Sequence, residues 1–249
     1  MVSATQAGLI ADYHFDGDAR DSSGFGHHGL VVGNSVRFNS VSPTTTLVDF
    51  DNPRLTPATG YIELPQELSD RLATSSFTIG LSTYHADPSI HGGRMFGTTV
   101  NGSRVNFVYR SQTTGRPYWE IGTPGQPFTT WWGDPALPEL FNKGLMYFWL
   151  VNDRAAGEVR LFVNGEEVSA KRIALGSFAF DNFFVGAING QTNAHGAAFA
   201  GVDRLLFFDT ALTAPEIRDY EAAVPEPVTT LLLGGLFCLK TRNRGSRKP

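Results

Sequence analysis

Cysteine, charged residues and catalytic motifs are all scarce in this sequence. The single cysteine, Cys238, excludes an intramolecular disulfide and a zinc site built from cysteines. The chain has no nucleophile elbow, zinc-protease helix motif, phosphate-binding loop or dinucleotide fingerprint. Retaining glycoside hydrolysis needs two carboxyl groups close together, and the glutamates show no such paired spacing. The sequence therefore predicts a protein that is not an enzyme, unless folding brings distant acids together.

Charge is low and unevenly distributed. Charged residues make up 18% of the chain and hydrophobic residues 41%, a composition that excludes general disorder. The net charge is −4, although the last ten residues hold a basic cluster with no acid: Lys240, Arg242, Arg244, Arg247 and Lys248. The rest of the chain is therefore more acidic than the whole. Because phosphate contacts need clustered Lys and Arg, we expect no nucleic-acid partner.

Turn residues and aromatic residues are abundant and favour an all-β fold. The chain contains 27 Gly, 14 Pro and 19 Phe, and aromatic side chains suit the pleated surface of a sheet. Short apolar or alternating segments recur every roughly 8 to 15 residues, which is typical of a sandwich or barrel. The candidate strands are Leu9–Phe15, Leu30–Phe38, Tyr61–Leu64, Phe77–Tyr84, Arg94–Val100, Arg104–Arg110, Pro117–Ile121, Leu145–Asn152, Glu158–Val163, Glu167–Ile173, Asn182–Ile188 and Ala198–Phe208.

Local signals define the turns between these strands. Asn-Gly pairs supply the positive φ angles of tight hairpins, and they occur at Asn101-Gly102, Asn164-Gly165 and Asn189-Gly190. The first two lie between good strand candidates and predict hairpins. Leu145–Val151 is apolar throughout, so we expect this strand to be buried on both faces.

Two segments carry helix signals. Pro65–Leu72 predicts a short helical turn. Thr213 and Glu216 have the spacing of a capping box, in which the glutamate reaches back to the helix start. We therefore expect a second helix that begins after Thr213 and ends near Ala222.

The order of these segments resembles laminin-G-like jelly-roll modules of the concanavalin A-like class. The resemblance rests on the segments Gly8–Gly17, Asp21–Gly29, Tyr61–Leu64, Ser76–Ile79, Val159–Glu166, Phe184–Ala187 and Gly201–Ile217. It implies a two-sheet antiparallel β-sandwich over residues 8–222, closed by a short C-terminal helix. The chain departs from the pattern at Ser82-Thr83, where such modules often carry Trp, and Asp87–Pro138 matches nothing in them.

The C-terminal part of the chain carries a separate signal in three steps. An apolar segment over 228–239 and a basic end over 240–249 follow a short motif made of Val224, Pro225, Glu226 and Pro227. This order resembles PEP-CTERM sorting tails.

The resemblance of the tail implies export in a Gram-negative bacterium and transient retention in the inner membrane. It also implies recognition of residues 223–249 by an exosortase. At the other end, residues 1–7 are interpreted as a leader remnant or a disordered start. The expected location is the cell envelope, the cell surface or the medium.

Modules of the resembling class often hold a structural Ca²⁺ where the first loop meets the last strand. Here the resemblance points to Asp16, Asp21 and Asp203 as side-chain ligands, with backbone carbonyls near Phe25 and His28. Calcium takes six to eight oxygens, and a loop of aspartates and glycines supplies both kinds. The alternative is that these aspartates cap turns by accepting hydrogen bonds from nearby backbone N–H groups.

Aromatic residues in a Gly- and Pro-rich stretch provide the candidate ligand contacts. Trp131 and Trp132, with Tyr118 and Trp119 nearby, could stack on sugar rings if they are exposed on loops. The alternative is a small hydrophobic cluster beneath a long loop. Either arrangement is compatible with the composition.

Three functions remain open at this point. The first is an exported, lectin-like module that binds extracellular polysaccharide. The second is a structural or adhesive matrix protein without a glycan site. The third, disfavoured because no acid pair is evident, is a polysaccharide-degrading enzyme. A sandwich of this kind hosts all three, so the fold alone does not decide.

Overall fold

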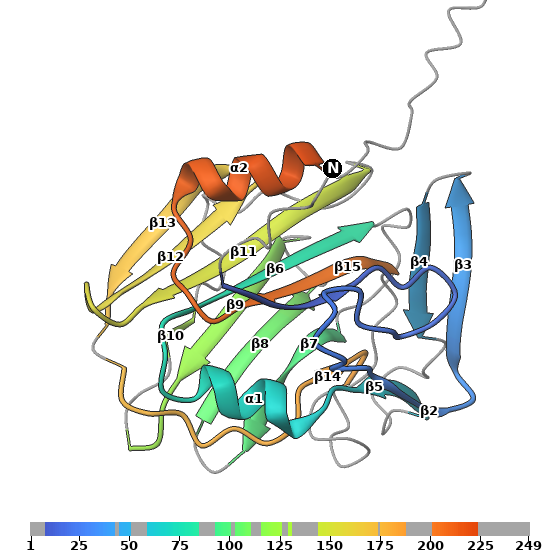
Figure 1. Ribbon diagram of the computed structural model, residues 1–249, viewed down its shortest axis with the longest axis horizontal. Helices are drawn as coiled ribbons and strands as arrows, with labels where there is room; N and C mark the ends of the chain where they lie inside the picture. Colours follow the sequence, from blue (N-terminus) through green and yellow to red (C-terminus); the bar gives the residue numbers. More distant parts are fainter. Residues whose placement is uncertain are drawn as a thin grey trace, which may run out of the picture.

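The computed structural model describes residues 8–42, 45–50, 59–84, 93–100, 103–110, 116–125, 129–130, 144–173, 175–187 and 201–223. These residues form two antiparallel β-sheets and two short helices (Figure 1). The two-sheet antiparallel β-sandwich expected from the sequence is confirmed. Within these ranges, no helix is long and apolar enough to span a bilayer.

The larger sheet has eight strands in the order β13-β12-β11-β6-β15-β4-β3, with β1 paired to β15. Its strands are β1 (Leu9–Tyr13), β3 (Val36–Ser42), β4 (Thr45–Phe50), β6 (Phe77–Tyr84), β11 (Leu145–Asp153), β12 (Glu158–Val163), β13 (Glu166–Arg172) and β15 (Gly201–Phe208). The first and last of these strands therefore lie side by side, with Asp12 opposite Leu206.

The smaller sheet has seven strands in the order β10-β9-β8-β7-β14-β5-β2. Its strands are β2 (Leu30–Gly33), β5 (Gly60–Glu63), β7 (Gly93–Val100), β8 (Ser103–Arg110), β9 (Arg116–Gly122), β10 (Thr129–Thr130) and β14 (Phe184–Val185). The helices are α1 (Gln66–Leu72) and α2 (Ala214–Ala223). Both helix predictions are confirmed.

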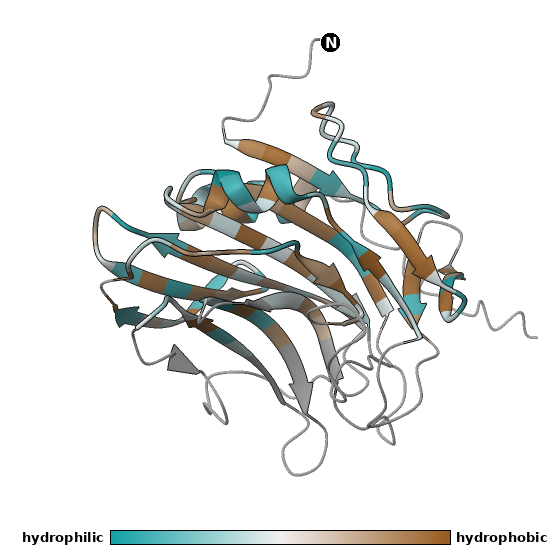
Figure 2. Cartoon of the chain, turned by 90° about the horizontal axis from the view of Figure 1, so that it is seen from below, coloured by the Kyte–Doolittle hydropathy of each residue, from teal (hydrophilic) through white to brown (hydrophobic). Residues whose placement is uncertain are grey.

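Two apolar cores hold the sandwich together. The main core lies between the sheets and is rich in aromatic contacts, such as Phe107 against Phe148 at 5.0 Å between ring centroids. A second core lies between the outer face of the larger sheet and α2, which buries Ile217 and Tyr220 there. Figure 2 shows α2 lying over this outer face. Strand β11 is consequently buried on both faces, as its apolar sequence predicted.

The hairpin predicted at Asn164-Gly165 is confirmed. It joins β12 to β13, and the two turn residues have φ angles of 48° and 73°. The Asn101-Gly102 and Asn189-Gly190 pairs lie outside the described residues. The positive φ angle of Asn164 fits its residue type, because Asn tolerates this conformation better than most non-glycine residues.

The start of α2 shows the predicted contact between Glu216 and Thr213. The Glu216 carboxylate accepts hydrogen bonds from the backbone N–H and the hydroxyl of Thr213, both at 2.7 Å. These bonds lower the pKa of Glu216. The helix therefore begins where the capping residues indicated.

One predicted strand is wrong and two were missed. Leu30–Phe38 is not a single strand, because the chain turns at Gly33 with a φ angle of 79° and passes from one sheet to the other. Strands β4 and β10 had no clear alternating pattern in the sequence. In the described part of Asn182–Ile188, only the two residues of β14 are in a strand.

Candidate functional site

The outer face of the larger sheet presents two rows of side chains beside α2. Antiparallel pairing places Tyr147 of β11 opposite Ser82 of β6, and Ser82 opposite Arg204 of β15. In the next row, Trp149 and Leu206 lie on either side of Gly80. Directly opposed residues share one face of a sheet, so these rows form one continuous surface.

Gly80 makes room for the Trp149 ring. A Cβ atom at Gly80 would lie 2.6 Å from Cε3 of the indole, closer than real Cβ contacts allow. Trp149 is only 1% exposed and packs in the second core with Phe208 and Tyr220. Glycine inside a strand often marks such a close approach. The missing side chain therefore lets the indole lie across the neighbouring strand.

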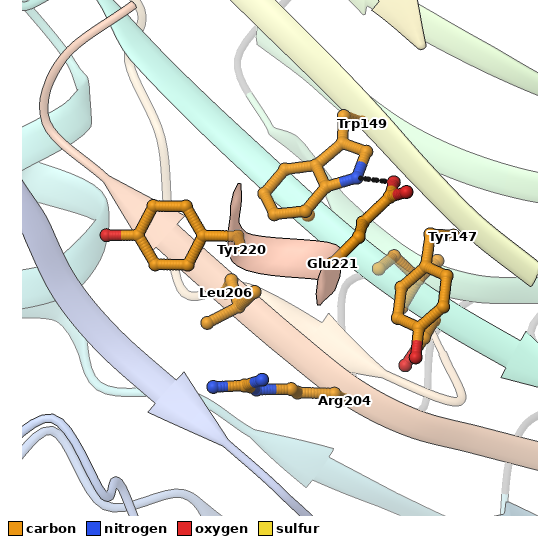
Figure 3. Close-up of a pocket in the computed structure, with 9 residues that line it drawn as sticks. Tyr147, Trp149, Arg204, Leu206, Tyr220 and Glu221 are labelled. Atoms are coloured by element: carbon orange, nitrogen blue, oxygen red, sulfur yellow. Dashed lines mark hydrogen bonds between the residues drawn. The ribbon is translucent and has the colours of Figure 1, made fainter. Parts of the chain in front are cut away.

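Helix α2 closes one side of this surface and creates a small open hollow. The hollow is lined by Gly80, Leu81, Ser82, Tyr147, Trp149, Arg204, Leu206, Tyr220 and Glu221. Figure 3 shows Trp149 and the Glu221 carboxylate on one side of this space and Arg204 on the other. The site thus combines aromatic walls with one acid and one base.

Glu221 is tied to the sheet by neutral donors. Its carboxylate accepts a hydrogen bond from Nε1 of Trp149 at 2.7 Å (Figure 3) and another from the backbone N–H of Gly165. Burial raises the pKa of Glu221, and these two hydrogen bonds oppose the rise. The same contacts fix the position of α2 relative to β11 and to the hairpin at Gly165.

Arg204 is held by Asp12 from the neighbouring strand β1. Its Nε and one Nη donate to the two carboxylate oxygens at 2.8 and 2.7 Å, which is a bidentate pair. His14 lies 3.2 Å from the same carboxylate. Burial disfavours the ionised form of Asp12, but the bonds to Arg204 and His14 outweigh it and lower the pKa of Asp12 to about 2.

Asp203 lies beside this pair at a bulge in β15. The register of β15 against β6 shifts between Val202 and Arg204, which gives Asp203 its extra position in the strand. The Ser82 hydroxyl donates to the Asp203 carboxylate at 2.8 Å. Burial and the nearby charge of Asp16 raise the pKa of Asp203. The structure therefore brings Asp16 and Asp203 within electrostatic reach of each other.

The other predicted calcium ligands have other contacts. The Asp21 carboxylate accepts hydrogen bonds from the backbone N–H groups of Asp12, Ser23 and His27 at 2.9, 2.8 and 3.0 Å. Burial alone would raise its pKa, yet these bonds lower it. Asp21 therefore caps the loop, as in the turn-capping alternative. Its role as a metal ligand stays a prediction from the sequence.

Phe25 and His28 belong to the same loop. Phe25 is 55% exposed, and the Arg71 guanidinium lies 5.4 Å from the centre of its ring. Nδ1 of His28 accepts a hydrogen bond from the backbone N–H of Asp21 at 3.1 Å. Among the described residues, no three His, Cys, Asp or Glu side chains are grouped to hold a metal ion. A calcium site at Asp16 and Asp203 would thus need backbone oxygens for most of its ligands.

Of the predicted aromatic contacts, Trp119 is in the wrong place for a ligand. It is 1% exposed and packs against Phe107 between the two sheets, because β9 directs it into the main core. Tyr118 lies in β9, paired with Val108. Trp131 and Trp132 lie outside the described residues.

The sorting motif also lies outside the part of the chain that the structure describes, which ends at Ala223. The motif comprises Val224, Pro225, Glu226 and Pro227. Its role in sorting therefore stays a prediction from the sequence.

The sequence interpretation missed the residues that form the hollow. Tyr147 and Trp149 were read only as part of a buried apolar strand. Two signals were available: aromatic residues at 147 and 149, which share one face of that strand, and a glycine inside the strand Phe77–Tyr84. Arg204 and Glu221 come from the consecutive elements β15 and α2, but both meet β11, which lies far from them in the sequence, so no local pattern joins the three.

No protein-family model matches the chain, and neither does any curated protein. Solved structures do match its fold. The binding domain of botulinum neurotoxin DC, in complex with rat synaptotagmin II, superposes with a TM-score of 0.65 at 12% identity, over 87% of this chain and 52% of that chain. A botulinum neurotoxin type C structure gives a TM-score of 0.65 at 11% identity, over 88% and 52% of the respective chains.

A third match is the receptor binding domain of the botulinum neurotoxin C/D mosaic serotype. It superposes with a TM-score of 0.63 at 14% identity, over 87% of this chain and 51% of that chain. This chain thus spans about half the length of these neighbours. At such low identity the likeness concerns the fold alone, and it agrees with the two-sheet β-sandwich described above.

Proposed function

We propose that the protein is an exported, lectin-like module that binds extracellular polysaccharide, with the hollow beside α2 as its contact site. The observation that carries this proposal is the lining of the hollow. Half-buried Tyr147 offers an aromatic surface, and the partly exposed Arg204 and Glu221 offer polar groups beside it. Sugars present both C–H faces and hydroxyl groups, and lectin sites meet them with this mixture of side chains.

The structural neighbours support a carbohydrate partner in general terms. Botulinum neurotoxin type C depends on interaction with two ganglioside molecules to enter cells, and a neurotoxin DC binding domain has been solved in complex with SialylT. These neighbours are binding domains, which agrees with a binding role for this chain. Trp131 and Trp132 remain predicted glycan contacts from the sequence.

We also propose export, sorting by an exosortase and a structural calcium ion. The sorting proposal rests on the motif from Val224 to Pro227, with Pro225 and Glu226 between them, and on the apolar and basic segments that follow it. The calcium proposal rests on the resemblance described above and on the repulsion between the Asp16 and Asp203 carboxylates, which a cation there would offset.

The test of the glycan proposal is a thermal melt of the full chain against a panel of soluble polysaccharides. We expect one class of glycan to raise the melting temperature, because a ligand that binds only the native state stabilises it. Tyr147→Ala should abolish the shift. Tyr84→Ala is the matched control, since Tyr84 is also half-buried on the larger sheet but does not line the hollow.

Other outcomes would assign the function differently. A shift that survives Tyr147→Ala but disappears in Trp131→Ala or Trp132→Ala would move the glycan site to those tryptophans. No shift with any glycan would favour the structural or adhesive alternative. That alternative has an observation of its own in the exposed apolar side chains of Phe25, Leu30, Val31 and Val41.

A further inference from the structure

The positive charge of Arg204, which lines the hollow, is balanced by the carboxylate of Asp12. Arg204 directs Nε and one Nη at the two oxygens of Asp12, which is 7% exposed. A bidentate pair of this geometry is strong and specific. A carboxylate ligand would have to compete with Asp12 for these donors. The charge of the guanidinium is therefore already balanced by Asp12, although three of its five N–H donors are not engaged by that carboxylate.

The carboxylate of Glu221, which also lines the hollow, has no charged partner of this kind among the described residues. Glu221 accepts hydrogen bonds from neutral groups, the indole N–H of Trp149 and the backbone N–H of Gly165. It has no ion-pair partner within the described part of the chain. An ionised carboxylate has about four acceptor sites on its two oxygens. Glu221 thus keeps unused acceptor capacity at the wall of the hollow.

A second carboxylate, that of Asp203, lies next to Ser82 and Arg204. Asp203 accepts a hydrogen bond from Ser82, which lines the hollow, and it also feels the neighbouring charges of Asp16, Arg204 and His14. Asp12, Asp16 and Asp203 thus surround Arg204, while the side chains of Arg218 and Glu221 both lie beside Gly165. Carboxylates are therefore in excess around Arg204, in line with the acidic body of the chain.

We infer that the hollow selects glycans with free amino groups, and that it discriminates against uronic acids. This inference deepens the proposed glycan-binding function and rests on it. An ammonium group on a sugar carries three N–H donors and would form a charge-assisted hydrogen bond with Glu221 beside the ring of Tyr147. The ligand class is an amino sugar in its unacetylated form.

The experiment titrates the full chain with short oligosaccharides of glucosamine, of N-acetylglucosamine and of galacturonic acid, in the presence of EDTA and followed by calorimetry. Charge-assisted hydrogen bonds are roughly twice as strong as neutral ones. We therefore expect the glucosamine oligomer to bind about tenfold more tightly than its acetylated form, and the galacturonate oligomer to bind most weakly. Added salt should reduce this preference.

Glu221→Gln should abolish the preference for the amine while leaving the acceptor for the Trp149 indole in place. Asp219→Asn is the matched control, because it removes the same charge from an exposed position on the same helix. A preference lost only in Glu221→Gln supports the inference. A preference lost equally in both variants overturns it, since net charge alone would then explain the selectivity.

The remaining outcomes distinguish a failure of the amine selectivity from a failure of the glycan-binding function. If the acetylated or galacturonate oligomer binds best and Tyr147→Ala abolishes that binding, the hollow is a glycan site and only its selectivity for amines is refuted. If none of the three oligomers binds, or if Tyr147→Ala leaves their binding unchanged, the hollow is refuted as a glycan site altogether.

Discussion

At the scale of single residues, the absence of a side chain at Gly80 determines where Trp149 lies. The indole occupies the space that a Cβ atom would fill, and it positions Glu221 through its N–H group. Asp12 acts in a comparable way on Arg204, because its two oxygens fix the guanidinium. The polar geometry of the hollow is therefore set by residues that themselves have little exposure.

Gly80→Ala should lower the free energy of unfolding by about 1–3 kcal/mol, the usual cost of overpacking. The added methyl group would press on the Trp149 ring. Urea unfolding of the purified variant measures this loss. The same substitution in a Trp149→Leu background should cost much less, since the clashing ring is gone; equal costs in both backgrounds would show that the two residues are not coupled.

The Asp12–Arg204 pair predicts a specific acid sensitivity. Because the pKa of Asp12 is lowered from 3.8 to about 2 in the folded state, the ionised carboxylate stabilises the fold above pH 3.8. That contribution, about 2 kcal/mol, is lost as the pH falls toward 2. The difference in unfolding free energy between wild type and Asp12→Asn should therefore be full at neutral pH and shrink below pH 3.8.

Denaturant unfolding at a series of pH values between 2 and 7 measures this difference. Asp18→Asn is the control, because Asp18 is exposed in the adjacent loop and its pairing with Arg20 is also exposed. A gap between wild type and Asp12→Asn that does not change with pH would contradict the assigned role of the pair.

At the scale of elements, α2 and the β12–β13 hairpin support each other. Gly165 in the turn lies beneath α2, where Arg218 donates to its carbonyl at 3.4 Å and Glu221 accepts from its N–H. The turn thus needs glycine for two reasons, its φ angle of 73° and the proximity of the helix. The helix forms one side of the hollow, and the hairpin holds the helix in place through these contacts.

Gly165→Ala should be more destabilising than Gly157→Ala. Both glycines have positive φ angles, of 73° and 63°, and strain of roughly 1–2 kcal/mol is expected at each. At Gly165 the new Cβ would lie 2.8 Å from the side chain of Arg218. At Gly157 no atom lies within 4 Å of the new Cβ. Thermal and urea unfolding of the two variants compare these costs directly, and equal losses would rule out the contact with α2.

Local signals explain which elements could be predicted from the sequence. The turn at Asn164-Gly165 and the start of α2 depend on residues within one turn of each other, and both were predicted correctly. The division of Leu30–Phe38 between two sheets depends on partners that lie elsewhere in the chain. The hollow escaped prediction for the same reason, since Arg204 and Glu221 meet β11 only after the sheet and the helix have packed.

At the scale of the whole molecule, an acidic body is folded without a disulfide around a large aromatic core. The charge of Asp16 is felt by Asp203 near the place where the first strand meets the last. A cation that joined them would link the two ends of the folded domain. Such a link would stabilise the entire sandwich and not only the loop.

Calcium should raise the melting temperature of the full chain relative to EDTA, by an amount on the order of 5 °C at saturating concentration. Asp16→Ala and Asp203→Ala should each abolish the calcium response. Magnesium, which requires a stricter octahedral shell, serves as the control ion and should have a smaller effect. Identical melting in calcium and in EDTA would eliminate the proposed ion site.

Helix α2 supplies Tyr220 and Glu221 to the hollow and is held on the sheet by the second core, which includes Ile217, and by the hydrogen bond from Trp149 to Glu221. Surface elements of this kind open locally without global unfolding. Each opening would withdraw both side chains at once, so a ligand is retained only by the fraction of molecules in which the helix is docked. The time for which a ligand stays bound in the hollow would therefore depend on how often α2 detaches from the sheet.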